Sequence, residues 1–297
     1  MVFISKKSVL SGIRVQEAMR RQVIALPAGA SIKRGISALI KYKVNAVLVT
    51  SHHDRPEGVV SGTDFVAAFY AGLPLESSLD NILSSPLLTC FPDDELEAGL
   101  DLMRENQVHQ VYVQGEKPES IIGLLAYYDI VGLLYRYCRA CKRSTSFNED
   151  HSPAGGQAQP VRVQEVMTRG VASCHSDQGL ERIIETLSEN RFGAVLMRTD
   201  QAEAAGVISK TDLVLAYSHG LSLEAKGGEI MNSPVLACEQ SDLLTIALQS
   251  MLLRDTKRVF VYHTDPEAIM GLVSLSDAAR FRSGSCRACL AGRMVAG

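Results

Sequence analysis

Apolar and polar residues follow one another along this chain in an order that occurs four times. In its first occurrence, Ser31 precedes apolar positions that recur at helical spacing through Ile40, which predicts a helix capped by serine. Two short β-rich runs follow at 44–50 and 58–61, and the polar residues between them predict a hairpin loop. A second helix is expected from Asp64 onward, where apolar positions again recur at helical spacing.

Three further stretches repeat this helix, strand, strand, helix order. Their first helices carry apolar stripes and are followed by β-rich runs: Leu96, Leu100 and Met103 with 108–113; Leu180, Ile183, Ile184 and Leu187 with 192–197; Leu243, Leu244, Ala247, Leu248 and Met251 with 258–262. A short strand near Val23 or Pro86 precedes the helix, so each unit is predicted to be β-α-β-β-α. Because about 60 residues bury little surface alone, we expect pairs of units to pack sheet to sheet.

The chain is a duplication, because its two halves match at one constant offset. The sequence VQEAM at Val15–Met19 recurs as VQEVM at Val163–Met167. The sequence GVVSGTD at Gly58–Asp64 recurs as GVISKTD at Gly206–Asp212. Residues 143–160 are rich in Ser, Gly, Pro and Gln, which predicts a flexible linker. The expected modules are therefore 1–142, with units at about 15–73 and 79–137, and 161–297, with units at about 163–221 and 227–282 before a C-terminal tail.

Composition narrows the class of protein. The 297 residues are 46% hydrophobic and 21% charged, which excludes a wholly disordered chain. A net charge of −3 gives no global attraction to nucleic acid or to an anionic membrane. No apolar stretch reaches the ~18–20 residues of a membrane span, and the N-terminal residues lack the apolar region of a signal peptide. Seven cysteines, an odd count, fit a reducing compartment, so we expect a cytoplasmic protein.

The turn from the second strand to the second helix carries the most specific pattern. Glycine, two apolar residues, a small residue and then aspartate occur four times, as Gly58-Val-Val-Ser61-Gly-Thr63-Asp64, Gly123-Leu-Leu-Ala126-Tyr-Tyr128-Asp129, Gly206-Val-Ile-Ser209-Lys-Thr211-Asp212 and Gly271-Leu-Val-Ser274-Leu-Ser276-Asp277. A β-α-β-β-α unit with this turn resembles the CBS (cystathionine β-synthase) domain, two of which in tandem form a Bateman module. The resemblance implies an α/β fold of four CBS units in two pseudo-symmetric Bateman modules, arranged as a disc.

The turn residues suit a nucleotide. A carboxylate can accept hydrogen bonds from both vicinal hydroxyls of a ribose, and hydroxyls beside a helix N-terminus suit a phosphate. The candidate ribose-binding residues are Asp64, Asp129, Asp212 and Asp277, and the candidate hydroxyls are those of Ser61, Thr63, Ser209, Thr211, Ser274 and Ser276. For any single turn, a plain helix cap is the better explanation. Four aspartates in register favour a ligand, with Asp64, Asp212 and Asp277 the strongest candidates because Ala126 replaces a hydroxyl at the second turn.

Further site residues follow from the resemblance. The chain is similar to four-CBS proteins such as the gamma subunits of AMP-activated protein kinase, and that family often places His and Arg before the strands of the second and fourth units to hold phosphates. The matching positions here are His109, Lys257 and Arg258, with Gln110 in place of a fixed positive charge. A half-buried histidine is the simpler explanation of His109, and a solvated strand entrance explains Lys257 and Arg258 as well as a phosphate site does.

Two Cys-x-x-Cys pairs, Cys138/Cys141 and Cys286/Cys289, are not explained by this resemblance. Four thiolates can bind tetrahedral zinc or an iron–sulfur cluster. Each pair could also act as a redox dithiol or pair with a second chain, and duplicated small residues at a helix end are the alternative without function.

The sequence therefore predicts a regulatory, energy-sensing protein that binds AMP, ADP or ATP in clefts between paired CBS units. S-adenosylmethionine is a further possible ligand. Occupancy would be transmitted to a protein partner or a second copy of the chain, without nucleic acid or membrane. The alternative is a metal-binding or redox sensor. The chain has no P-loop, no His-Glu-x-x-His and no nucleophile beside a recognisable base, so we do not expect an enzyme.

Overall fold

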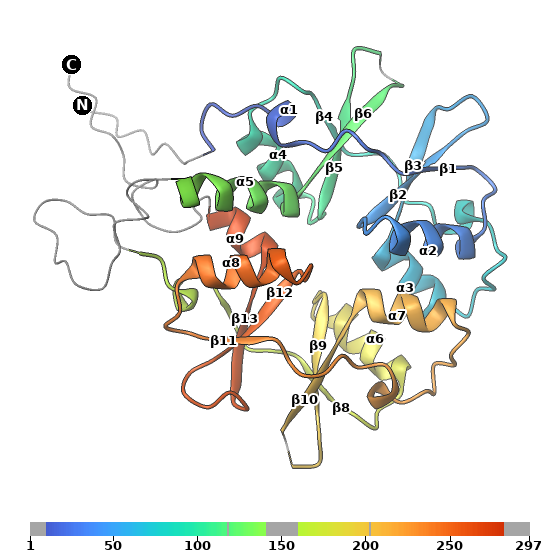
Figure 1. Cartoon of the computed structure of the whole chain (residues 1–297). Helices are drawn as coiled ribbons and strands as arrows, with labels where there is room; N and C mark the ends of the chain where they lie inside the picture. The colour runs from blue at the N-terminus through green and yellow to red at the C-terminus, as the bar shows by residue number, and fades with distance from the viewer. Residues whose placement is uncertain (1–9, 118, 141–159, 202, 282–297) are drawn as a thin grey trace, which may run out of the picture.

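The computed structural model describes residues 10–117, 119–140, 160–201 and 203–281. Four mixed α/β units stand around a ring, with the first module in the upper half of Figure 1 and the second in the lower half. This confirms the predicted fold class, four β-α-β-β-α units in two related modules that together form a disc.

The first unit shows how the sequence builds each quarter of the ring. Strand β1 (Ala25–Pro27) pairs in parallel with β2 (Ala46–Thr50), and β2 pairs antiparallel with β3 (Pro56–Ser61). Helix α2 (Ile32–Lys41) begins at the predicted cap, where the Ser31 hydroxyl accepts a hydrogen bond from the Arg34 N–H. Helix α3 (Gly62–Tyr70) follows β3 directly.

The other three units repeat this order. The second contains β4 (Thr89–Cys90), α4 (Leu96–Glu105), β5 (Gln110–Gln114), β6 (Ile121–Ala126) and α5 (Tyr127–Ala140). The third contains β8 (Ser173–His175), α6 (Leu180–Glu189), β9 (Ala194–Arg198), β10 (Ala204–Ser209) and α7 (Lys210–Ser218). The fourth contains β11 (Ala237–Glu239), α8 (Leu244–Leu253), β12 (Arg258–Tyr262), β13 (Ile269–Ser274) and α9 (Leu275–Phe281).

Within each module the two units exchange the segments that precede them. Helix α1 (Val15–Ala18) leads into the first unit but packs on the second, and Arg20 pairs there with Leu124 of β6. In return, a 3-10 turn at Leu79–Ile82 leads into the second unit but packs on the first. The second module repeats this exchange with strand β7 (Thr168–Arg169) and with 3-10 turns at Val163–Glu165 and Gly227–Glu229.

Four residues at equivalent positions pair the exchanged segments with a strand of the other unit. We call them the bridging residues: Ser84, Arg20, Asn232 and Thr168. Each pairs with the residue after the glycine of a repeated turn: Val59 with Ser84, Leu124 with Arg20, Val207 with Asn232, and Leu272 with Thr168. A Cβ atom on the glycine would lie 2.5–2.8 Å from the carbonyl oxygen of the bridging residue, at Gly58, Gly123, Gly206 and Gly271 alike. The glycine of the motif is therefore required by a close backbone approach.

The ring is closed by two kinds of apolar contact. Inside each module the sheets pack together, around Tyr112 and Leu124 in the first and around Phe260 in the second. Between modules the helices pack, α3 against α7 and α5 against α9, each pair within one continuous core. The rings of Phe69 and Tyr217 stack between α3 and α7 with centroids 5.0 Å apart.

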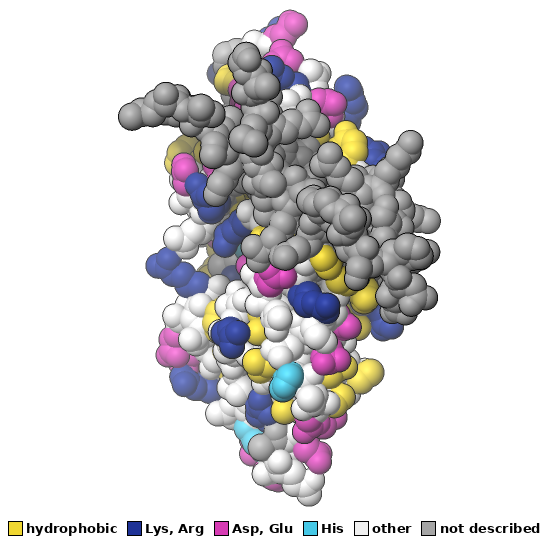
Figure 2. Space-filling view, turned by 90° about the vertical axis from the view of Figure 1, so that its left-hand side faces the viewer, with side chains coloured by type: hydrophobic (Ala, Val, Ile, Leu, Met, Phe, Trp, Pro, Cys, Tyr) yellow, Lys and Arg dark blue, Asp and Glu magenta, His cyan; other side chains and the backbone are white. Residues whose placement is uncertain are grey.

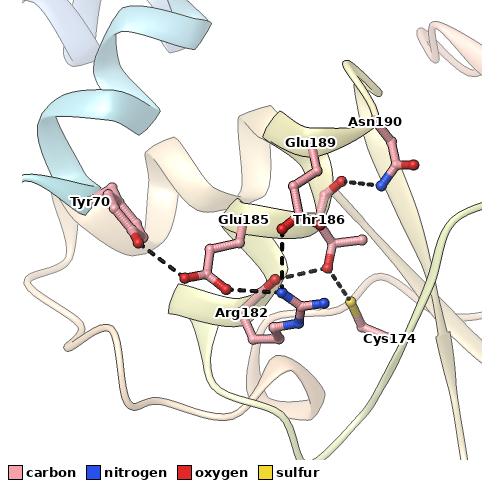
Figure 3. Close-up of polar contacts among 7 residues, drawn as sticks. All are labelled: Tyr70, Cys174, Arg182, Glu185, Thr186, Glu189 and Asn190. Atoms are coloured by element: carbon pink, nitrogen blue, oxygen red, sulfur yellow. Dashed lines mark hydrogen bonds and ion pairs between the residues drawn. The ribbon is translucent and has the colours of Figure 1, made fainter.

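Polar contacts join the modules beside this helical packing. Figure 3 shows the Tyr70 hydroxyl of the first unit donating to Glu185 of α6, with 3.1 Å between the oxygens. Arg182 forms ion pairs with Glu185 (3.1 Å) and Glu189 (3.6 Å) on the same helix. These groups are exposed to solvent, which screens their charges, so they contribute little to stability. The apolar helix faces dominate the module contact.

Diagonal contacts cross the ring at four equivalent residues, each just after the first helix of its unit. Lys43 forms an ion pair with Asp255, and Arg191 donates to Gln107 over 2.9 Å. All four residues have positive φ, between 52° and 55°. This left-handed backbone ends each helix and turns the residue toward the opposite unit.

The close approach at the motif glycines predicts a large difference between two glycine substitutions in one unit. In Gly58→Ala the new Cβ would lie 2.5 Å from the backbone oxygen of Ser84, so the exchanged segment must shift. We expect the free energy of unfolding to fall by about 1–3 kcal/mol. The control is Gly62→Ala at the start of α3, where nothing lies within 4 Å of the added atom.

Urea unfolding followed by far-ultraviolet circular dichroism measures both variants. We expect Gly62→Ala to stay within about 1 kcal/mol of the parent protein. Equal midpoints for the two variants would contradict the requirement for glycine at the bridge.

Candidate functional site

A cavity of about 1770 Å³ lies at the centre of the ring and is lined by residues of all four units. Ligand sites for small molecules commonly have about 300–1,000 Å³, so the space could accommodate more than one ligand. The sequence-predicted residues that line it are Ser61, Thr63, Asp64, His109, Ser209, Thr211, Asp212, Lys257, Arg258, Ser274, Ser276 and Asp277. Residues far apart in the sequence thus line the same cavity.

Each hydroxyl–aspartate turn forms a helix cap. The Ser61 hydroxyl oxygen accepts from the N–H of Thr63 at 3.2 Å, and Asp64 Oδ2 accepts from the Ser61 N–H at 2.7 Å. Asp212 Oδ2 accepts in the same way from Ser209 N–H at 2.7 Å, and Asp277 Oδ2 from Ser274 N–H at 2.9 Å. The cap that the sequence left open as an alternative is therefore present, and it uses one carboxylate oxygen.

The second oxygen of these aspartates has a different role. Asp64 Oδ1 accepts from the Ser84 hydroxyl at 3.1 Å, and Asp212 Oδ1 accepts from the Asn232 side-chain amide at 2.7 Å. Within the described part of the chain, no hydrogen bond reaches the corresponding oxygen of Asp277. Capping and ligand binding are compatible, because a carboxylate oxygen has capacity for a further donor.

Asp129 differs from the other three turn aspartates. The sequence predicts it as a ribose-binding residue, but it does not line the cavity. Its Oδ2 accepts from the Ala126 N–H at 2.9 Å, and its Oδ1 forms an ion pair with Arg20 Nε at 2.7 Å. Its side chain is only 8% exposed. Burial raises the pKa of Asp129, and the Arg20 charge opposes that rise.

A cluster of cations surrounds His109, which lies just before β5. Burial and the positive charges of Lys257, Lys210, Arg258 and Arg280 lower the pKa of His109 to about 4. The imidazole is therefore neutral at physiological pH. Its ring meets the Tyr127 ring edge to face at 5.9 Å. Part of the cavity wall thus concentrates positive charge in a molecule whose net charge is −3.

Lys210 is a cavity cation that sequence reasoning missed. It occupies the turn position held by Gly62, Tyr127 and Leu275 in the other units. Its ammonium donates to the Thr63 hydroxyl of the other module at 2.9 Å. Burial and the neighbouring Arg258 lower its pKa. The sequence does contain a signal for Lys210, because it is the one basic residue at this position among the four equivalent turns.

Lys257 and Arg258 reach across the ring. The Lys257 ammonium donates to Asn45 Oδ1 at 2.6 Å, and burial with the nearby Arg258 lowers the pKa of Lys257 to about 8. Burial lowers the pKa of Arg258 to about 10, so its guanidinium stays charged at neutral pH. A Cβ at position 193 would lie 2.5 Å from Arg258 Nη2, so Gly193 leaves the space that this side chain uses.

Apolar surface lines the cavity where the sheets of each module meet. In the first module it includes Val59, Leu87 and Tyr112, and in the second Val207 and Phe260. Flat apolar walls of this kind suit an aromatic ring. On the face that Figure 2 shows, basic, acidic and hydrophobic side chains are interspersed over the described residues. None of the described helices is both long and apolar enough to cross a bilayer.

Of the paired cysteines only Cys138 is among the described residues, and it does not line this cavity. Cys138 is buried on α5, whereas Cys141, Cys286 and Cys289 lie outside the described residues. The described residues contain no group of three or more His, Cys, Asp or Glu side chains arranged to hold a metal ion. Zinc or iron–sulfur binding by the cysteine pairs stays a prediction.

Known proteins share this architecture. Protein MJ1225 of Methanocaldococcus jannaschii is 21% identical over 203 residues, which cover 68% of this chain and 69% of that protein. A crystal structure of MJ1225, described as a candidate archaeal homologue of the gamma subunit of AMP-activated protein kinase, matches with a TM-score of 0.73 at 13% identity, covering 91% of this chain and 99% of that chain. A conserved protein of Pyrococcus horikoshii matches with a TM-score of 0.60 at 15% identity, covering 91% of this chain and all (100%) of that one.

These structural matches show a common fold. The sequence pattern of the CBS domain matches this chain four times, at residues 15–71, 79–136, 163–219 and 228–284. The chain belongs to the CBS domain family.

Proposed function

We propose that this protein is a non-catalytic regulator that binds adenine nucleotides in its central cavity. One observation carries the proposal: three turn aspartates that can each accept a further hydrogen bond line the same cavity as a cluster of cations. A nucleotide needs both kinds of group at once, acceptors for the ribose hydroxyls and positive charge for the phosphates.

The cavity supplies a place for each part of the ligand. The ribose diol would donate to Oδ1 of Asp64, Asp212 or Asp277, and would replace the neutral donors Ser84 and Asn232 at the first two. The phosphates would lie toward Lys257 and Arg258, close to the helix N-termini. The base would lie between the apolar sheet surfaces of one module. Neutral His109 can donate one further hydrogen bond to a phosphate oxygen.

Binding in this cavity would couple the two modules. Lys210 of the second module already contacts Thr63 of the first, and Lys257 of the fourth unit contacts Asn45 of the first. A phosphate between these groups would favour the module arrangement that brings them together. The ligand thus shifts the population of arrangements, and a partner protein or a second copy would bind one of them preferentially.

The nucleotide proposal predicts selective loss of binding when a turn aspartate is removed. In Asp212→Ala the ribose loses its charged acceptor, and such a bond is worth about 1.5–3 kcal/mol, equivalent to about 10- to 150-fold in affinity. Calorimetric titration with AMP, ADP and ATP should show one class of site weakened by that amount. Asp242→Ala is the control, because Asp242 also closes a turn, with Oδ2 3.0 Å from the Glu239 nitrogen, but does not line the cavity.

The result that contradicts the proposal is equally direct. If the parent protein binds none of AMP, ADP, ATP and S-adenosylmethionine, the proposed function is wrong. Equal nucleotide affinity in Asp212→Ala and Asp242→Ala would mean that Asp212 caps its helix and does not bind the ribose.

The lowered pKa of Lys257 predicts a pH dependence of binding. A phosphate favours the charged ammonium, so raising the pH through about 8 removes a positive charge from the free site and weakens AMP binding. The AMP phosphate itself, with a second pKa of about 6, does not change charge between about pH 7 and 9. We expect the affinity to fall over this range in the parent protein and to stay level in Lys257→Arg, whose guanidinium remains charged. An identical pH profile in both proteins would remove Lys257 from the phosphate site.

A further inference from the structure

The four bridging residues, Ser84, Arg20, Asn232 and Thr168, occupy one equivalent position but differ in chemistry. The backbone of each is fixed by pairing with the strand that leads to a turn. The carbonyl of each lies against the motif glycine. The backbone is thus the same at all four turns, and only the side chain changes beside the aspartate.

The side chains fall into two groups. Ser84 and Asn232 are neutral donors. The Ser84 hydroxyl oxygen lies 3.1 Å from Asp64 Oδ1, and the Asn232 amide nitrogen lies 2.7 Å from Asp212 Oδ1. Thr168 is exposed, lines the cavity and makes no hydrogen bond to Asp277 within the described part of the chain. Arg20 alone among the four is charged, and its guanidinium forms an ion pair with Asp129.

Charge decides whether a ribose can displace the bridging side chain. A ribose hydroxyl that replaces a neutral donor exchanges one hydrogen bond for another. Displacing the partly exposed Arg20 would leave the Asp129 carboxylate, which is only 8% exposed, without its opposite charge, which costs more than exchanging one neutral donor for another. The Tyr128 ring centroid lies 6.0 Å from the Arg20 guanidinium carbon, and Tyr128 stands where the other turns have Thr or Ser.

We infer that the bridging side chain selects which turns accept a ribose, and that Arg20 closes the turn at Asp129. Ser84, Asn232 and Thr168 leave Asp64, Asp212 and Asp277 open, so nucleotides occupy three turns and not the fourth. The inference rests on the proposed nucleotide function and names the residue that sets its stoichiometry.

The duplication supplies the test, because Thr168 is the counterpart of Arg20 in the second module. Thr168→Arg places a guanidinium beside Asp277 on a backbone already shaped for it. Thr168→Gln is the matched control, since it adds a long polar side chain without charge. We expect calorimetric titration with AMP to give three equivalents for the parent protein and for Thr168→Gln, and two for Thr168→Arg.

The reverse substitution tests the same idea where Thr168→Arg fails to fold. Arg20→Thr frees Oδ1 of Asp129, although Ala126 and Tyr128 still replace the Ser and Thr hydroxyls that the other turns offer to a phosphate. Adenosine, which needs no phosphate contact, is therefore the probe. We expect Arg20→Thr to bind one more equivalent of adenosine than the parent protein, as measured by equilibrium dialysis.

The possible failures are distinguishable. A parent protein that binds no nucleotide overturns the proposed function and this inference with it. A parent protein that binds AMP, combined with an unchanged AMP stoichiometry in Thr168→Arg, overturns the inference alone. An unchanged adenosine stoichiometry in Arg20→Thr would also overturn the inference alone. So would four AMP equivalents on the parent protein.

Discussion

The backbone contact between each motif glycine and its bridging residue is the constraint on which the rest of this structure depends. It locks the exchanged segments into place, with added Cβ atoms excluded at 2.5–2.8 Å in all four units. The same contact puts one side chain beside each turn aspartate. Architecture and binding chemistry therefore share a single structural element. A module cannot separate its units without also uncovering the carboxylates that would receive a ligand.

Closing the ring brings like charges together at its centre. Arg258 contributes to lowering the pKa of both Lys210 and Lys257, and all three lower that of His109. The cavity thus holds its cations at an electrostatic cost, which the apolar packing of the helices between modules offsets. A bound anion would relieve this repulsion, so the charges proposed to bind a phosphate would also make the ring respond to it.

Much of this arrangement was accessible from the sequence, and the exceptions have a physical reason. Periodicity located the helices and strands because burial on one face imposes it, as at Ser31–Ile40, where the cap and stripe were both correct. The repeated turns indicated the fold by resemblance. Sequence alone could not pair Arg20 with Asp129 or Lys210 with Thr63, because these contacts join distant positions through the closed ring. Nor could it separate a cap from a ligand site, since Oδ2 of each carboxylate forms the cap and leaves Oδ1 for the proposed ligand.

The diagonal contacts show what covalent linkage of the two modules permits. Lys43 and Arg191 are equivalent basic residues, yet one faces Asp255 and the other faces Gln107. In a homodimer of a single module, symmetry would make both diagonals identical, and every substitution would appear twice. With both halves in one polypeptide, mutation can strengthen one diagonal and relax the other. The two diagonals of the disc can therefore evolve different strengths, which makes its two sides inequivalent.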